Sequence, residues 1–248
     1  MKVLAIDAGN TRVKWGIHDG GEWFLRGSHE TASSETGAAF RHVNKESAFG
    51  RIIVSNVAGP AVANAIKDAL YAFGVPVTFI TALAEQCGVE NRYEQPAQLG
   101  TDRWAALIGA HASARETPRS HLVVMAGTAL TIDALTMEGA FLGGIIVPGI
   151  SLMRQALNRG TAQLPAAADA HQSFPRNTVS AISSGAVEAC AGAVQRMYTH
   201  LTAQLGHAPH CIGSGGAIEL LSHHLPFPVR INDNLVLDGL LEIARSPT

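Results

Sequence analysis

The sequence has little of what marks several common protein classes. It holds three cysteines, Cys87, Cys190 and Cys211, and none stands in a CxxC spacing. This odd, scattered set argues against a disulfide framework and favours reduced thiols in a cytosolic protein. The 18 basic and 20 acidic residues give a net charge of −2. No basic excess is present to attract nucleic acid or an anionic membrane, so neither partner is expected.

Long hydrophobic runs are also missing. The first apolar run ends at Asp7, which is too early for the core of a signal peptide. The longest uncharged stretch, residues 139–153, contains four glycines and Pro148. This composition is typical of a strand, a turn and the start of a helix rather than of a membrane span. A cytoplasmic protein is therefore expected.

Two apolar runs each end in a similar glycine turn. Val3-Leu4-Ala5-Ile6 is followed by Asp7-Ala8-Gly9-Asn10-Thr11, and Leu122-Val123-Val124 is followed by Met125-Ala126-Gly127-Thr128-Ala129. A β-rich segment comes after each turn, unlike the helix that follows a P-loop. The repeat predicts two similar halves, each offering backbone N–H groups to phosphate, as in the fold of actin, hexokinase and Hsp70.

The 248 residues, 47% of them apolar, are enough for one large domain or two modest ones. The predicted fold class is α/β, with two ribonuclease H-like domains whose mixed central sheets are flanked by helices. The domains are expected at 1–117 and 118–248. Asp19-Gly20-Gly21 predicts a hairpin turn, and Cys87 to Leu99 an irregular loop. Helices are expected at 36–47, 61–73, 101–114, 150–158, 178–205, 217–223 and 235–244.

The first turn carries the residues of a phosphate site. Asp7 follows a buried strand, where a carboxylate is costly unless it meets a cation, and we expect it to orient Mg²⁺ through water. Gly9 permits close backbone approach, and Asn10 and Thr11 supply donors. Arg12 and Lys14 share one strand face, and Lys14 is expected to reach phosphate. Taken alone, the segment is explained equally well as an ordinary turn.

Two further segments fit phosphate more weakly. Thr128, Thr131 and Asp133 surround the second turn, for which a polar β-turn is an equal explanation. Gly213-Ser214-Gly215-Gly216 precedes a predicted helix and in isolation favours a plain strand-to-helix connection. The three segments in this order are much more specific than any one of them.

Gly100-Thr101-Asp102-Arg103 opens a predicted helix with Thr101 as its N-cap. Asp102 could simply complement the helix dipole. With Arg103 beside it and Tyr93 upstream, it also suits a hydroxylated acidic substrate: Arg103 would hold a carboxylate or carbonyl and Asp102 would accept a proton. The histidines, among them His207, His210, His223 and His224, show no metal-binding pattern with cysteine or carboxylate partners, so surface or core roles are expected.

The ordered motifs closely resemble type III pantothenate kinase over nearly the whole chain. They are Asp7 to Arg12, Gly100 to Arg103, Gly127-Thr128-Ala129, the segment from Gly143 to Gly149, and Asn177-Thr178 through Gly185. The resemblance implies an ATP-dependent, Mg²⁺-using homodimer that phosphorylates the 4′-hydroxyl of pantothenate, the first step towards coenzyme A.

The resemblance also implies residue roles. Asp102 matches the proton acceptor. ATP contacts would be Asp7, Ala8, Gly9, Asn10, Thr11, Arg12, Val13, Lys14 and Thr128. Pantothenate contacts would be Tyr93, Gly100, Thr101, Asp102, Arg103 and Thr178.

One position departs from the family. Met125 stands where the family usually has an aspartate that helps to hold a monovalent cation, K⁺ or NH₄⁺, and a thioether is a poor ligand for a hard cation. Two other functions stay open from the sequence: a Baf-type accessory role in transcription, and a kinase of the same superfamily with another small hydroxylated substrate.

Overall fold

The computed structural model describes residues 1–31, 40, 43, 48–160 and 170–246. Contacts divide the chain into two compact units. Unit 1 comprises Met1–Thr117, Glu138–Phe141 and Asn234–Thr248, and unit 2 comprises Pro118–Met137 and Leu142–Asp233. The predicted domains followed the chain without interruption, whereas the chain returns to unit 1 at its C-terminal end.

Unit 1 is built on a five-stranded sheet of order β3-β2-β1-β4-β5. Its strands are β1 (Val3–Ala8), β2 (Arg12–His18), β3 (Trp23–Glu30), β4 (Arg51–Asn56) and β5 (Val77–Phe79). β1 to β3 form an antiparallel meander, and β4 and β5 continue parallel to β1. The sheet is therefore mixed, and the predicted hairpin lies between β2 and β3, where Asp19 Oδ1 accepts hydrogen bonds from the N–H groups of Gly21 and Glu22.

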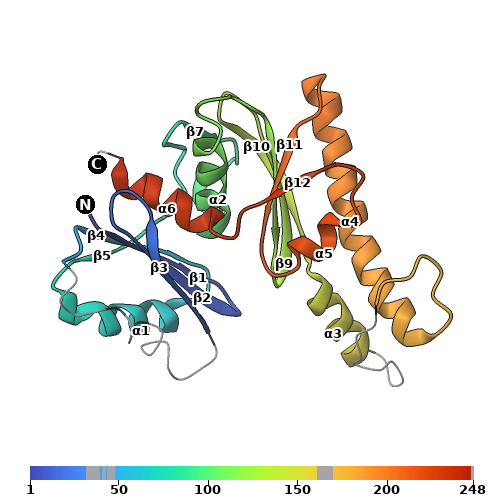
Figure 1. The fold of residues 1–248 in the computed structure, drawn as a ribbon, viewed down its shortest axis with the longest axis horizontal. Helices are drawn as coiled ribbons and strands as arrows, with labels where there is room; N and C mark the ends of the chain where they lie inside the picture. Colours follow the sequence, from blue (N-terminus) through green and yellow to red (C-terminus); the bar gives the residue numbers. More distant parts are fainter. Residues whose placement is uncertain (32–39, 41–42, 44–47, 161–169, 247–248) are drawn as a thin grey trace. The chain divides into compact units, whose positions relative to one another are not determined.

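Helices cover the sheet of unit 1. On one side lies α1 (Pro60–Leu70), continued by a 3₁₀ turn, η2 (Tyr71–Phe73), and its Ile66 and Leu70 join the core formed with Leu4 and Ile6. On the other lie α2 (Thr101–Ala112) and α6 (Leu235–Arg245), which pack against each other (Figure 1). The remaining elements are β6 (Glu85–Gln86), β7 (Val89–Asn91), η3 (Pro96–Gln98) and the start of β10, which pairs with β7.

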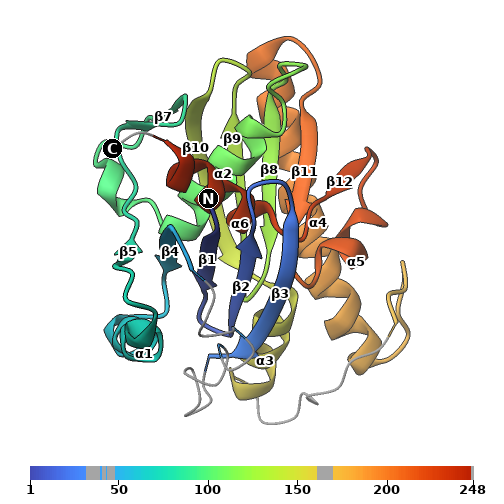
Figure 2. The ribbon, with the colours of Figure 1, turned by 60° about the vertical axis from the view of Figure 1, so that its left-hand side comes forward.

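Unit 2 repeats the strand plan. Its strands are β8 (His121–Ala126), β9 (Ala129–Leu135), β10 (Ala140–Pro148), β11 (His210–Ser214) and β12 (Val229–Ile231), in the order β12-β11-β8-β9-β10. β8 pairs antiparallel with β9 and parallel with β11, as β1 does with β2 and β4 (Figure 2). The helices are α3 (Ile150–Gly160), α4 (Thr178–Leu205) and α5 (Ile218–Ser222), and the core contains Val124, Ile132 and Val187.

The helix predictions that fall on described residues are mostly confirmed, with boundary shifts of at most three residues. α4 has the predicted bounds, and Gly74 ends η2 in the left-handed conformation at φ 65°. The irregular loop at Cys87 to Leu99 is wrong in part, because β7 and η3 lie within it. The helix predicted at 36–47 falls largely outside the described residues. Among the described residues no helix is long and apolar enough to cross a membrane.

The close packing of α2 on α6 depends on two glycines, so a larger residue at either position should destabilise the folded protein. A Cβ added at Gly239 would overlap the backbone of Ala105, and one at Gly109 would overlap the carbonyl of Leu235. Backbone cannot move aside as a side-chain end can, so Gly239→Ala is expected to lower the free energy of unfolding by about 3 kcal/mol. Thermal denaturation should show a Tm lower by roughly 6–12 °C.

Gly192→Ala on α4 is the matched control. A Cβ at Gly192 meets nothing within 4 Å, and alanine is the better helix former, so its Tm should stay the same or rise slightly. Equal melting of the two variants would contradict the close-packing argument.

Candidate active site

Three adjacent strands of unit 1 place Lys14, Asp7 and Ser55 in one row. Asp7 on β1 pairs with Lys14 on β2 and with Ser55 on β4, and paired residues on neighbouring strands project to the same face of a sheet. Ser55, which is buried, shares a hydrogen bond of 2.9 Å with the Thr101 hydroxyl. The first residue of α2 is thereby tied to the end of this row.

Asp7 supplies the carboxyl of this row, and its surroundings strongly disfavour the ionised form. Its Oδ1 is buried and has no hydrogen-bond partner. Burial, followed by repulsion from Asp102, raises the Asp7 pKa to about 7, while Lys14 lowers it. Part of the residue remains accessible to solvent, so the buried oxygen, not the whole side chain, carries the desolvation cost. An unsatisfied carboxylate oxygen beside a second carboxylate fits the oxygen-donor chemistry of Mg²⁺.

The N-terminus of α2 presents Asp102. The N-cap is Gly100, so the prediction of Thr101 as N-cap is wrong, and Thr101 is the first helical residue. Asp102 Oδ1 accepts a hydrogen bond of 2.8 Å from the Arg103 N–H. A Cβ on Gly100 would come within 2.7 Å of Asp102 Oδ1. Glycine at this position therefore leaves the space that the Asp102 carboxylate occupies.

Arg103 and Tyr93 lie together, as the sequence predicted. The Arg103 side chain is buried, and its Nη1 donates to the Tyr93 hydroxyl at 3.1 Å. Its guanidinium lies 5.7 Å from the Tyr93 ring centroid and 6.0 Å from that of Phe141, within cation–π range. Sequence reasoning missed Phe141 and Ser55, since neither stands in a motif and only the fold brings them to these positions.

The first glycine turn is tightly closed. Gly9 N–H donates to the Arg12 carbonyl at 3.0 Å, and the Thr31 hydroxyl donates to the Gly9 carbonyl at 2.7 Å. A Cβ on Gly9 would lie 3.2 Å from the Arg12 oxygen. Asn10, Thr11 and Arg12 are exposed, whereas Ala8 and Val13 are buried. Of the predicted ATP residues here, Ala8 and Val13 therefore have only backbone groups to offer.

The second turn, in unit 2, has a comparable closure. Gly127 N–H donates to the Ala129 carbonyl at 3.0 Å, and both Gly127 and Thr128 are exposed. Gly149 and Gly215 lie against this turn, because a Cβ on Gly149 would overlap the Gly127 carbonyl and one on Gly215, at φ 104°, would crowd the backbone of Ala126. Two glycines of the later motifs are thus required by the backbone packing around Thr128.

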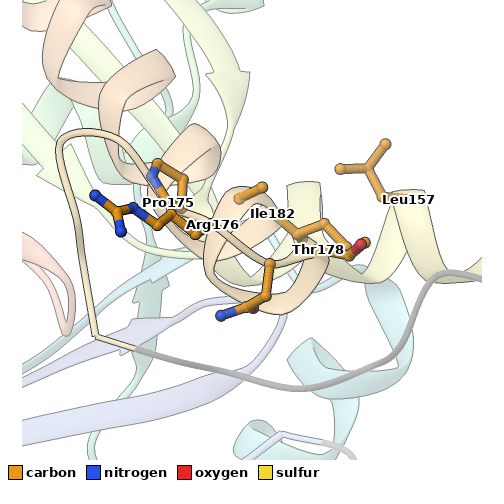
Figure 3. A pocket seen from close by; sticks show the side chains of 7 residues that line it. Leu157, Pro175, Arg176, Thr178 and Ile182 are labelled. Carbon is orange, nitrogen blue, oxygen red and sulfur yellow. The ribbon is translucent and has the colours of Figure 1, made fainter.

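Thr178 lies at the start of α4, where Asn177 is the N-cap and accepts a hydrogen bond from the Ser180 N–H at 2.9 Å. It lines an open cavity of about 600 Å³ in unit 2 (Figure 3). The other lining residues come from the end of α3, from the segment that leads into α4 and from the start of α4 itself: Leu157, Pro175, Arg176, Asn177, Ala181 and Ile182.

Comparison with known proteins assigns the family. Residues 3–200 match the family model for type III pantothenate kinase. The chain belongs to the type III pantothenate kinase family. Proteins of that name from Aromatoleum aromaticum and Nitrosospira multiformis are 47% and 44% identical to it, over 98% of this chain and 98% and 91% of theirs.

Solved structures of lower identity share the fold of this kinase family member. A Sinorhizobium meliloti protein described as a 2-dehydro-3-deoxygalactonokinase aligns with TM-score 0.62, 16% identity and 98% coverage of both chains. A Campylobacter jejuni protein described as a Baf family transcriptional activator aligns with TM-score 0.59 and 21% identity, over 98% of this chain and 97% of its own. With the two mixed sheets, these likenesses confirm the predicted ribonuclease H-like fold class.

Met125, where the resemblance to type III pantothenate kinases implies an aspartate, is half-buried on β8 and pairs with Thr131 on β9. The two side chains therefore project to the same face. The Thr131 hydroxyl oxygen is buried without a hydrogen-bond partner. Methionine offers it only a weak sulfur acceptor, so this position supplies no charge to bind a cation.

Proposed function

We propose that this protein transfers the γ-phosphoryl group of ATP to the 4′-hydroxyl of pantothenate, the first step of coenzyme A synthesis. The observation that carries the proposal is the placement of Asp102 close enough to the buried Asp7 carboxyl to raise its pKa, in a member of the type III pantothenate kinase family. From the resemblance we further propose a cytoplasmic homodimer that uses Mg²⁺.

Each residue group has a proposed part. Asp102 orients the substrate hydroxyl and accepts its proton, since its carboxylate stands at the half-buried N-terminal end of α2 with one oxygen already held by the Arg103 N–H. Arg103 and Tyr93 form a preorganised pair for the acid and amide groups of pantothenate, with Gly100, Thr101 and Thr178 as further contacts. Residues Asp7 to Lys14 and Thr128 contact ATP.

The positive charge that phosphoryl transfer requires comes from two sources in this proposal. Lys14 brings a cation opposite Asp7. The Asp7 carboxylate would hold Mg²⁺ through water, and that ion neutralises charge on the phosphates when bound. The exposed backbone of the Gly9 and Gly127 turns supplies N–H donors. Catalysis then rests on positioning and charge neutralisation rather than on a covalent intermediate.

The test is ADP release by the purified protein with MgATP, with and without pantothenate, against a panel of sugars and hydroxy acids. Pantothenate-dependent release is the expected result. Faster ADP release with another hydroxylated compound would identify that compound as the substrate in place of pantothenate. A folded protein that binds ATP but turns over none of the compounds would overturn the kinase proposal.

Met125 predicts a weak response to K⁺. At constant ionic strength, replacing Na⁺ by K⁺ should change the turnover of the wild type by less than about 2-fold, since a thioether does not hold a hard cation. A Met125→Asp variant, which places a carboxylate beside Thr131, should show the larger K⁺ response. If K⁺ activates the wild type as strongly as it activates Met125→Asp, this role for Met125 is contradicted.

A further inference from the structure

Unit 2 contains a cluster that no sequence pattern marked. His171 precedes α4, Glu188 lies on α4, and His224 follows α5, and each offers a ligand atom within 4.8 Å of the other two. His171 Nε2 lies 2.7 Å from Glu188 Oε1. The rings of His171 and His224 have centroids 4.1 Å apart at 57°. The sequence shows no metal-binding pattern around His224, and only the fold brings it to His171 and Glu188.

The ligand types of His171, Glu188 and His224 favour particular metal ions. Two imidazole nitrogens and one carboxylate oxygen are ligands for Zn²⁺ and related ions such as Co²⁺, whereas Mg²⁺ and Ca²⁺ prefer oxygen alone. Tetrahedral ligands at about 2.0–2.2 Å from an ion lie roughly 3.3–3.6 Å apart. The ligand atoms lie within 4.8 Å of one another, with 2.7 Å between His171 Nε2 and Glu188 Oε1, so movements of about 1 Å bring them to these separations. Three protein ligands leave the fourth position for water.

The cluster is held in place and open on one side. The backbone N–H of Gln172, next to His171, donates to Ser184 Oγ at 3.0 Å, which fixes the segment on α4. The His171 side chain is only 16% exposed, whereas that of Glu188 is 62% exposed. An ion can therefore reach the set past the exposed Glu188 and meet the largely buried His171 imidazole. An ion pair between His171 and Glu188 alone does not account for the close approach of the His171 and His224 rings.

We propose that His171, Glu188 and His224 form a Zn²⁺ site. A bound ion would join the segment before α4, α4 itself and the end of α5. The cavity-lining residues Pro175 to Thr178 lie four to seven positions after His171. The ion would thereby restrict the segment that carries Thr178. The site itself does not depend on the proposed kinase activity.

The experiment titrates Co²⁺ into chelator-treated full-length protein without nucleotide, follows the visible ligand-field absorption, and then displaces Co²⁺ with Zn²⁺. The wild type is expected to bind one Co²⁺ and to show the intense visible absorption of a four-coordinate Co²⁺ with imidazole ligands. Bound Zn²⁺ should raise its Tm. His171→Ala and His224→Ala should each weaken binding by at least about 100-fold, and Glu188→Gln by about 10-fold or more. Circular dichroism checks that each variant is folded.

His223→Ala is the matched control, because His223 is the exposed neighbour of His224 and outside the cluster. It should bind like the wild type. Binding that survives in the His171→Ala and His224→Ala double variant, or that falls equally in His223→Ala, would assign the ion to scattered surface histidines and overturn the site. Absence of binding to the wild type would overturn it directly.

Discussion

An Asp102→Asn variant is expected to lose turnover by about 10²–10⁴-fold while remaining folded. Asparagine keeps the size of aspartate and an oxygen that can accept the hydrogen bond from the Arg103 N–H. It cannot take a proton from the pantothenate hydroxyl. The KM for pantothenate should change only a few-fold, since the contacts of Arg103 and Tyr93 are retained. Steady-state kinetics at saturating ATP measures both constants.

The control for this variant is Asp238→Asn. Asp238 is also an acidic residue in the first turn of a helix, α6, and its Oδ1 accepts a hydrogen bond from Trp23 Nε1. Both variants lose a favourable charge at a helix N-terminus, which is worth about 0.3–1 kcal/mol of stability. Only Asp102→Asn should lose turnover. Near-normal turnover of Asp102→Asn would remove Asp102 from the role of base.

Local sequence signals predicted most of the fold. The glycine turns after two apolar runs, the Asp19 hairpin and the helical periodicity of residues 178–205 each depend on neighbours in the chain, and the structure has all of them. The failures involve contacts between distant residues. Nothing local indicates that α6 returns to unit 1, because its apolar face would suit either unit until Gly109 and Gly239 are seen to meet.

The same distinction holds for the site. Asp7, Asp102 and Arg103 stand in recognisable motifs, but the neighbours of Asp7 on either side, Lys14 and Ser55, come from pairing across strands. The hydroxyl contact between Ser55 and Thr101 joins residues 46 positions apart, and the cation–π contact of Arg103 with Phe141 depends on the pairing of β7 with β10. The His171 cluster was missed for the same reason, since its ligands are separated by 17 and 36 residues.

Asp7→Asn is expected to stabilise the protein and abolish most of its activity. An acid whose pKa rises on folding keeps its proton while the unfolded chain loses it, so stability falls as the pH rises from about 4 to about 7 and then stays level. Between a pKa of 3.8 and one of about 7, at 1.36 kcal/mol per pKa unit, the ionised carboxylate costs the fold on the order of 4 kcal/mol. Asparagine removes that cost.

Urea unfolding between about pH 4 and pH 8.5, without nucleotide, measures the difference. The stability gain of Asp7→Asn over the wild type should be small at the acid end and reach a plateau above about pH 7. Asp19→Asn is the control of opposite sign, because backbone N–H groups of Glu22 and Gly21 lower the Asp19 pKa, so that its ionised form favours the fold at neutral pH and its loss should destabilise.

The Asp102 charge supplies a second check on the same carboxyl. Repulsion from Asp102 is one of the causes that raise the Asp7 pKa, so in Asp102→Asn the loss of stability between about pH 4 and pH 7 should be smaller than in the wild type. In the Asp7→Asn, Asp102→Asn double variant that loss should be absent. If the free energy of unfolding has the same pH dependence in the wild type, the two single variants and the double variant, burial does not raise the Asp7 pKa. In that case the basis for placing a cation beside it would be gone.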